Sequence, residues 1–240
     1  MRENKQYFTK LKVIMRKTLK EALRSLYEAM LKDNGISVLN EQNYCCMAPS
    51  VGEKYPKMPN EGIVFYGRAN NGWTTGVDDS FDTIYDDGAE GLTDYIKGNS
   101  SPFLRTAGKA FSNYYGEEWY EHVAYSNLYK VAPPSGNPTD TICGTQWEYV
   151  TEIFKKEIKT LSPKFVVMFA GKCWADDFVW YVNGEKMPEP LETIEWDKNY
   201  GYEINIYKIG EVYYLVSEHP QGKKENLHAE AILSVFEKYK

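Results

Sequence analysis

The chain has 240 residues, of which 42% are hydrophobic and 26% are charged, and these values are typical of one soluble globular domain. A chain of this length buries roughly 70–75% of its unfolded surface, so its core needs neither a metal nor a disulfide. The longest apolar run, residues 165–170, is too short to cross a bilayer. The four cysteines include no C-x-x-C pair, which argues against a zinc site.

The charges are unevenly distributed along the chain. Residues 1–32 contain nine Lys or Arg and three Glu, whereas the other 208 residues contain 19 basic and 31 acidic side chains. We interpret the basic segment as the solvated face of a helix, and contact with phosphates is the alternative. The charged N-terminus lacks the apolar centre of a signal peptide, so we expect a cytoplasmic protein.

The first segment, residues 1–35, is predicted to form an amphipathic helix that Gly35 terminates. The prediction depends on apolar side chains at steps of three and four: Phe8, Leu11, Met15, Leu19, Ala22, Leu23, Leu26 and Met30. Residues 36–60 contain three prolines and are expected to be a loop. A buried strand is predicted over 62–66, followed by the turn-rich stretch 67–72.

Helices and strands alternate in the rest of the chain. Residues 74–101 are acidic and rich in turn formers, and they are predicted to be a loop over the edge of the domain. Helical spacing is present in residues 103–115, 147–161, 171–180 and 227–239. Strands are expected over residues 123–126, 165–169, 202–207 and 212–216, the last two forming a hairpin.

This alternation predicts a three-layer α/β/α sandwich with a mainly parallel central sheet, formed by residues 1–240 as a single domain. In such sheets, ligands bind beyond the carboxyl ends of the strands. The segments expected to meet there are 67–73, 127–130, 171–174 and 218–223.

Several common catalytic motifs are absent from the sequence. There is no G-x-x-x-x-G-K-[ST] phosphate loop, no G-x-G-x-x-G after a strand, no H-E-x-x-H and no G-x-S-x-G. Three histidines are too few for a histidine-rich metal site. We therefore expect neither a metal nor another cofactor.

Four segments contain a more specific pattern. The longest comprises VAYSNLYKVAPPSGNPTD (123–140) and EIKTLSPKFVVMFAGKC (157–173). The others are SPFLRTAGKAF (101–111), the stretch GRANN (67–71) after the first strand, and EHP (218–220) after the last. In their order along the chain, these segments resemble the uracil-DNA glycosylase superfamily, and most closely its iron–sulfur bacterial and archaeal branch. The resemblance covers residues 61–225, roughly two-thirds of the chain.

The resemblance implies an enzyme of base excision repair that hydrolyses the N-glycosidic bond of uracil or a related deaminated base in DNA. It places the ring that stacks on the base at Phe103 and the amide that reads the uracil edge at Asn127. His219 would donate a hydrogen bond to uracil O2 as negative charge develops there. The other base-binding positions are Gly67, Arg68, Ala69 and Asn71, and contacts to the nucleic-acid backbone fall to Lys130, Gln221 and Lys223.

The chain departs from this branch in its cysteines and in its first motif. Only Cys143 stands where a cluster cysteine belongs, so we expect no iron–sulfur cluster. Arg68 and Ala69 occupy the positions of the usual water-activating residues. The candidates to replace them are Asn70, which we group with His219 as catalytic, and Asn71, Asp78, Asp79 or Asp82.

Three functions remain open at this point. The first is the glycosylase, and the second is a module that binds a nucleobase, a nucleotide or single-stranded nucleic acid without hydrolysis. The third is an interaction protein with an aromatic interface. We expect uracil-containing or otherwise damaged DNA, or a free nucleobase or nucleotide, as the partner, and no membrane. Arg68 has an alternative role as an ion-pair partner of the acidic residues 78–94.

Overall fold

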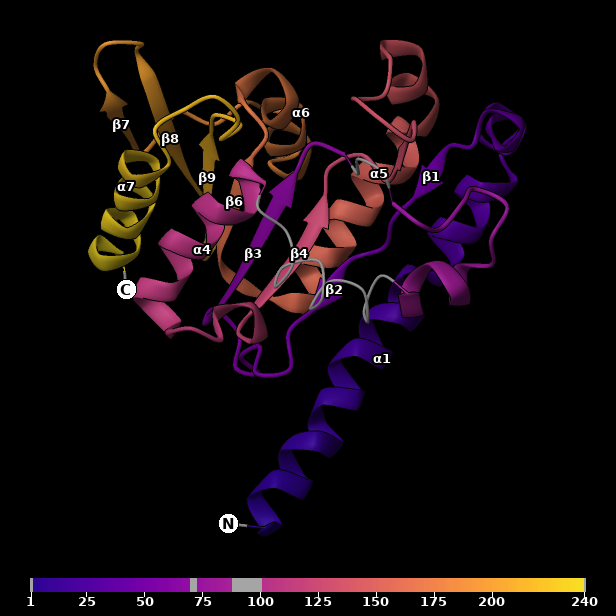
Figure 1. The fold of residues 1–240 in the computed structure, drawn as a ribbon, viewed down its shortest axis with the longest axis horizontal. Helices are drawn as coiled ribbons and strands as arrows, with labels where there is room; N and C mark the ends of the chain where they lie inside the picture. The colour runs from indigo at the N-terminus through magenta and orange to yellow at the C-terminus, as the bar shows by residue number, and fades with distance from the viewer. Residues whose placement is uncertain (1, 70–72, 88–100, 240) are drawn as a thin grey trace.

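The computed structural model describes residues 2–69, 73–87 and 101–239, with side chains from Met15 onward. Its centre is a seven-stranded sheet in the order β2-β4-β3-β6-β9-β8-β7 (Figure 1). The inner strands β4, β3, β6 and β9 are parallel to one another. Strand β2 at one edge, and β8 and β7 at the other, run antiparallel to their neighbours.

The sheet strands are β2 (Ser50–Val51), β3 (Gly62–Gly67), β4 (Val123–Asn127), β6 (Pro163–Phe169), β7 (Glu192–Asp197), β8 (Tyr202–Ile209) and β9 (Val212–Ser217). Strands β1 (Cys45–Cys46) and β5 (Val131–Ala132) pair separately. The helices are α1 (Arg2–Lys32), α2 (Asn34–Ser37), η1 (Val38–Gln42), α4 (Pro102–Tyr115), η2 (Trp119–Glu121), α5 (Asp140–Leu161), α6 (Lys172–Val182) and α7 (Glu225–Lys238).

Helices cover both faces of the sheet. Successive side chains of a strand point to opposite faces, so Val64 and Tyr66 of β3 pack with α1, α5 and α6, whereas Ile63 and Phe65 pack with α4 and α7. Because both faces are covered, the central strands are apolar throughout instead of alternating. The predicted α/β/α layers and mainly parallel sheet are therefore present.

Two stretches predicted as loops contain short elements. Residues 36–60 include part of α2, η1, β1 and β2, which are too short to produce a periodic pattern. Gly35 does not terminate α1, because it lies inside α2. Its N–H donates to Oδ1 of Asp33 (2.8 Å), which is the N-cap residue of that helix. Within 74–101, residues 81–87 are helical, and residues 88–100 lie outside the described part of the chain.

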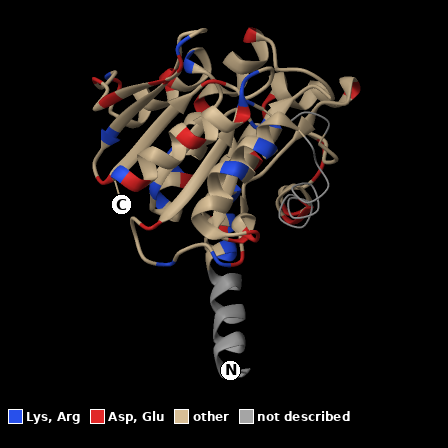
Figure 2. Cartoon of the chain, turned by 60° about the vertical axis from the view of Figure 1, so that its left-hand side comes forward, with Lys and Arg blue, Asp and Glu red and all other residues tan. Residues whose placement is uncertain are grey.

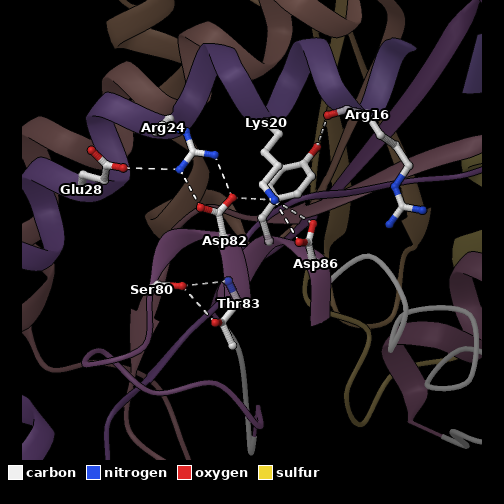
Figure 3. A network of polar contacts seen from close by, with 9 residues as sticks. Arg16, Lys20, Arg24, Glu28, Ser80, Asp82, Thr83 and Asp86 are labelled. Carbon is white, nitrogen blue, oxygen red and sulfur yellow. Dashed lines mark hydrogen bonds and ion pairs between the residues drawn. The ribbon is translucent and has the colours of Figure 1, made fainter. Parts of the chain in front are cut away.

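The basic face of α1 is paired with this helical segment (Figure 3). Lys20 Nζ lies 2.7 Å from Asp82 Oδ1 and 2.9 Å from Asp86 Oδ1. Arg24 holds the Asp82 carboxylate through two guanidinium nitrogens, at 2.7 and 2.9 Å. The basic face is exposed to solvent at Lys17 and Arg24, whose side chains are 70% and 38% exposed, whereas the Lys20 side chain is only 18% exposed. The sequence did not predict that Lys20 and Arg24 form ion pairs with the 81–87 segment. Elsewhere, basic and acidic residues are interspersed over the described fold (Figure 2).

Candidate functional site

A cleft of about 440 Å³ lies at the carboxyl ends of β3, β4 and β9, the edge where ligands bind in such sheets. It is lined by Gly67, Arg68, Ala69, Trp73, Ser101, Pro102, Phe103, Tyr125, Asn127, Gly136, Asn137, His219 and Gln221. Seven of the predicted site residues are in this set: Gly67, Arg68, Ala69, Phe103, Asn127, His219 and Gln221. Asn70 and Asn71 lie outside the described residues, so their roles stay predictions.

Gly67 and Asn127 are neighbours in the pairing of β3 with β4. A Cβ at residue 67 would lie 2.4 Å from Asn127 Oδ1, so only glycine lets the amide lie against β3 at this point. Asn127 Oδ1 accepts a hydrogen bond from the Tyr125 hydroxyl (3.2 Å), and its Nδ2 donates to the Met47 sulfur (2.9 Å). Sulfur is a weak acceptor. Among the described contacts, the amide therefore retains donor and acceptor capacity for a ligand.

Phe103 belongs both to the core and to the cleft wall. Helix α4 begins with a Ser101 cap and Pro102 in its first turn, which is a favourable N-terminus and fixes the position of Phe103. The ring is 9% exposed and packs against Phe65 and Phe169 (ring centres 5.8 and 5.6 Å apart). The same ring lies nearly parallel to the His219 imidazole (centres 6.1 Å, planes 20°). The core therefore holds an aromatic surface in place beside the cleft.

His219 is a neutral hydrogen-bond donor in this environment. Burial lowers the pKa of its imidazole to about 4, and the positive charges of Arg68 and Lys223 act in the same direction. The backbone N–H of Gln221 donates to Nδ1 (3.3 Å). A neutral imidazole that accepts at Nδ1 carries its proton on Nε2. The ring can therefore donate to a developing oxyanion near pH 7 without being charged itself.

Arg68 is held at the cleft by the end of β6. Its Nε donates to the Ala170 carbonyl (2.5 Å), and its guanidinium lies 5.6 Å from the Trp174 ring centre. Among the described acids of the 78–94 segment, Asp82 and Asp86 pair with α1 instead. The expected contribution of residues 171–174 is thus indirect, because they support Arg68 and do not line the cleft.

The predicted backbone contact of Lys130 is wrong, because its side chain is buried. Lys130 Nζ donates to Glu157 Oε1 (2.9 Å), to Ser126 Oγ (2.7 Å) and to the Asn127 carbonyl oxygen (2.6 Å). Tyr66 donates to the other Glu157 oxygen (2.8 Å). Lys130 and Glu157 are 1% and 0% exposed, so this ammonium group cannot reach a phosphate. The sequence shows Lys130 at the end of a strand but not the direction of its side chain.

The three candidate loop acids, Asp78, Asp79 and Asp82, do not line the cleft. Asp79 accepts the Gly76 N–H (2.7 Å), and Asp82 pairs with Lys20 and Arg24. Asp78 lines a separate hollow beside α1. None of the described residues that line the cleft is Asp or Glu, so the polar groups that they offer to a water molecule are neutral apart from Arg68.

Sequence reasoning did not assign roles to several residues that line the cleft: Ser101, Tyr125 and Asn137. Asn137 could have been recognised from the sequence, because it begins the Asn-Pro-Thr stretch within the glycosylase-like pattern. Tyr125 could not have been recognised in this way, because an aromatic residue within an apolar strand is typical of a core. Lys223, in contrast, does not line the cleft and lies against Tyr202.

Comparison with known proteins gives no match, either among protein-family models or among curated proteins. Within the described residues, no group of three or more His, Cys, Asp or Glu side chains is arranged to hold a metal ion. No described helix combines the length and apolar character that a bilayer crossing requires.

Proposed function

We propose that the protein binds uracil or a related deaminated base in the cleft and hydrolyses its N-glycosidic bond in DNA, on a glycosylase-like fold. The observation that carries this proposal is the convergence of three groups at one cleft. These are the Phe103 ring, the Asn127 amide and the neutral His219 imidazole. They come from three separate parts of the chain, and each matches one chemical feature of uracil.

The chemistry assigns one task to each group. The base leaves the nucleic-acid stack and lies against Phe103. The Asn127 amide accepts from uracil N3–H and donates to O4. As the C1′–N1 bond breaks, its electron pair moves to the base and charge develops on O2, where the His219 Nε2–H donates. A donor fixed in this way contributes about 3–4 kcal/mol to the transition state. Water adds to C1′, and the proton that it loses passes through solvent to the departing uracil anion, so the products are neutral uracil and an abasic sugar.

A second function is favoured by the absence of a carboxylate from the described cleft lining. Without a group that activates water, the same cleft would hold a nucleobase, a nucleotide or a single-stranded segment and leave the glycosidic bond intact. Asn137 is one of the neutral polar residues that line the cleft, and its amide is a weaker base than a carboxylate.

Base release from labelled oligonucleotides that contain one uracil tests the two functions. The substrate is presented single-stranded and double-stranded, with protein in excess. The first function predicts release by the natural protein and strong loss in His219→Ala and Asn127→Leu. Release that persists unchanged in both variants would contradict the assigned roles. No release, together with retained uracil binding, would favour the second function.

We also propose that the protein acts in the cytoplasm. All four cysteines, Cys45, Cys46, Cys143 and Cys173, are free thiols in the structure, which is the usual state in a reducing compartment.

A further inference from the structure

An exposed aromatic surface lies at the carboxyl ends of the parallel strands, as the cleft does. Strand β8 is antiparallel to both β7 and β9, so the turn after β7 and the segment after β9 leave the sheet at one edge (Figure 1). Tyr200 lies in that turn. Its exposed fraction of 67% is the largest among the described large hydrophobic residues.

Tyr200 is held in place although it is exposed. Its ring stacks on Tyr202, with centres 5.4 Å apart and planes at 13°. Tyr202 in turn packs on the buried Trp196 at 5.2 Å. Gly201 between the tyrosines has a φ of +64°, which lets the chain turn tightly enough to place the two rings together. The result is a rigid aromatic pair that presents ring surface to solvent.

Lysines from the segment after His219 lie against these rings. Lys223 Nζ is 4.8 Å from the Tyr202 ring centre, and Lys224 Nζ is 5.9 Å from that of Tyr200. Glu218 and Asp197 lie 3.9 and 3.0 Å from the two ammonium groups and restrict their positions. Lys198 is exposed in the tyrosine turn itself. Two lysines thus lie against the stacked aromatic pair, Lys224 with its side chain 52% exposed and Lys223 with its side chain 15% exposed. They do so in a chain whose net charge is −6.

We propose that this surface, which we call the tyrosine platform (Tyr200, Tyr202, Lys223 and Lys224), binds single-stranded nucleic acid beside the cleft. Aromatic rings that stack with bases, together with cations that meet phosphates, are the combination that binds single strands without sequence preference. Paired bases in a duplex do not expose their flat faces, so the platform selects single strands. The choice of nucleic acid as the partner rests on the proposed function.

The chain connects the platform directly to the cleft. His219 and Gln221 line the cleft, and Lys223 and Lys224 follow within the same segment. Lys223 comes four residues after His219 and contacts the Tyr202 ring, so a strand with one base in the cleft can extend along this segment toward the platform. The platform holds the flanking strand, whereas Asn127 and His219 act on the base itself.

Fluorescence anisotropy with a labelled, uracil-free oligothymidylate of about 15 nucleotides tests the platform, since single-strand sites span up to roughly this length. The natural protein is expected to bind, with an affinity that falls as salt rises. Tyr200→Ala should weaken binding about tenfold, the size of one lost base-stacking contact, and Tyr200→Phe should restore it. Met58→Ala is the matched control, because Met58 is 64% exposed and precedes β3 at the opposite edge.

The platform would be overturned by equal binding of Tyr200→Ala and the natural protein, or by no binding of either. The proposed function fails independently of it. If Tyr200-dependent binding occurs but no uracil is released from a single-stranded substrate, the glycosylase function is contradicted and the proposed platform is supported. If uracil is released and Tyr200→Ala leaves KM unchanged, the proposed platform is contradicted and the glycosylase function is supported.

Discussion

Neighbouring residues at the ends of β3 and β4 belong to two different polar groups on opposite faces of the sheet. Gly67 and Asn127 face the cleft, where the polar side chains keep hydrogen-bonding capacity for a ligand. Tyr66 and Ser126, one residue earlier in each strand, donate to Glu157, which Lys130 also contacts. This second group, the Lys130–Glu157 network, is sealed in the core.

The difference shows which interactions serve folding and which are open to function. A charged pair in the core is tolerated only when every partner is satisfied, and Glu157 receives three hydrogen bonds in this network, from Tyr66, Ser126 and Lys130. Because Lys130 also donates to the Asn127 carbonyl oxygen, the sealed group fixes the strand end that presents the Asn127 amide. The position of the Asn127 amide in the cleft therefore depends on the network, whereas the three hydrogen bonds to Glu157 involve no residue that lines the cleft.

The largest expected effect comes from breaking the network. Lys130→Met leaves the Glu157 carboxylate buried without its ion-pair partner, so the free energy of unfolding should fall by about 3–5 kcal/mol. Urea denaturation measures this change. Lys155→Met, whose side chain is 59% exposed in the natural protein, should change stability by less than about 1 kcal/mol. Equal losses in the two variants would contradict the assigned role of the network.

Replacing the cleft donor should affect activity and leave stability nearly unchanged. His219→Ala is expected to reduce the rate of base release about 10²–10³-fold, the usual loss for one oxyanion donor. His219→Gln retains an N–H donor and should keep part of the rate. Single-turnover kinetics measures both variants, and thermal denaturation checks that their folds are intact. A rate of His219→Ala equal to that of the natural protein would remove this residue from the mechanism.

The two histidines near the end of β9 should also differ in their effects. Burial lowers the pKa of His228 to about 3, and its Nε2 lies 2.6 Å from Ser217 Oγ in the core. In the unfolded chain the His228 imidazole takes up a proton near pH 6.5, whereas in the folded protein it does so only near pH 3. The contribution of His228 to the free energy of unfolding is therefore complete above pH 6.5 and is lost as pH falls toward 3. Between pH 6.5 and 4 the loss is roughly 3 kcal/mol for one such group.

Denaturation of the natural protein and of His228→Gln across this pH range measures that contribution. The variant should show the weaker pH dependence of the two. Base release should show no inflection near pH 6.5, because the His219 pKa of about 4 keeps the ring neutral there. A titration of His219 near 6.5 by NMR would contradict the assigned environment of the cleft.

The smallest effect is expected for the surface pairs of α1. Arg24 and Asp82 are 38% and 55% exposed, so solvent screens their attraction, and Arg24→Gln should cost less than about 1 kcal/mol. The loss should shrink further at high salt. Urea denaturation at low and high ionic strength measures it. A loss as large as that of Lys130→Met would erase the distinction between exposed and sealed ion pairs.

The strands and layers were predictable because their signals are local. The apolar runs at 62–66 and 165–169 and the helix face of 147–161 identify buried elements without knowledge of the fold. Strand β7 was not predicted because it is an edge strand with alternating exposure. Its polar residues outnumber its apolar ones, so it contains no apolar run of the kind that identifies the central strands. The meeting of strand ends at one edge follows from topology alone, so much of the cleft lining could be anticipated.

The direction of individual side chains could not be predicted. Lys130 follows a strand end just as Arg68 does, yet Lys130 turns into the core and Arg68 lies at the cleft. The partner of a charge depends on contacts between residues far apart in the chain, such as Arg24 with Asp82. The sequence placed Asp82 near the first motif, but the fold brings it to α1.

Our proposal requires that the cleft holds a uracil base against Asn127 and His219. The most direct test is an NMR titration of the ¹⁵N-labelled protein with free uracil, following the Asn127 side-chain amide and the His219 ring. We predict saturable shifts of both signals with uracil, weaker shifts with cytosine, and loss of binding in Asn127→Leu. Unchanged signals at millimolar uracil, or shifts confined to residues outside the cleft, would contradict the claim.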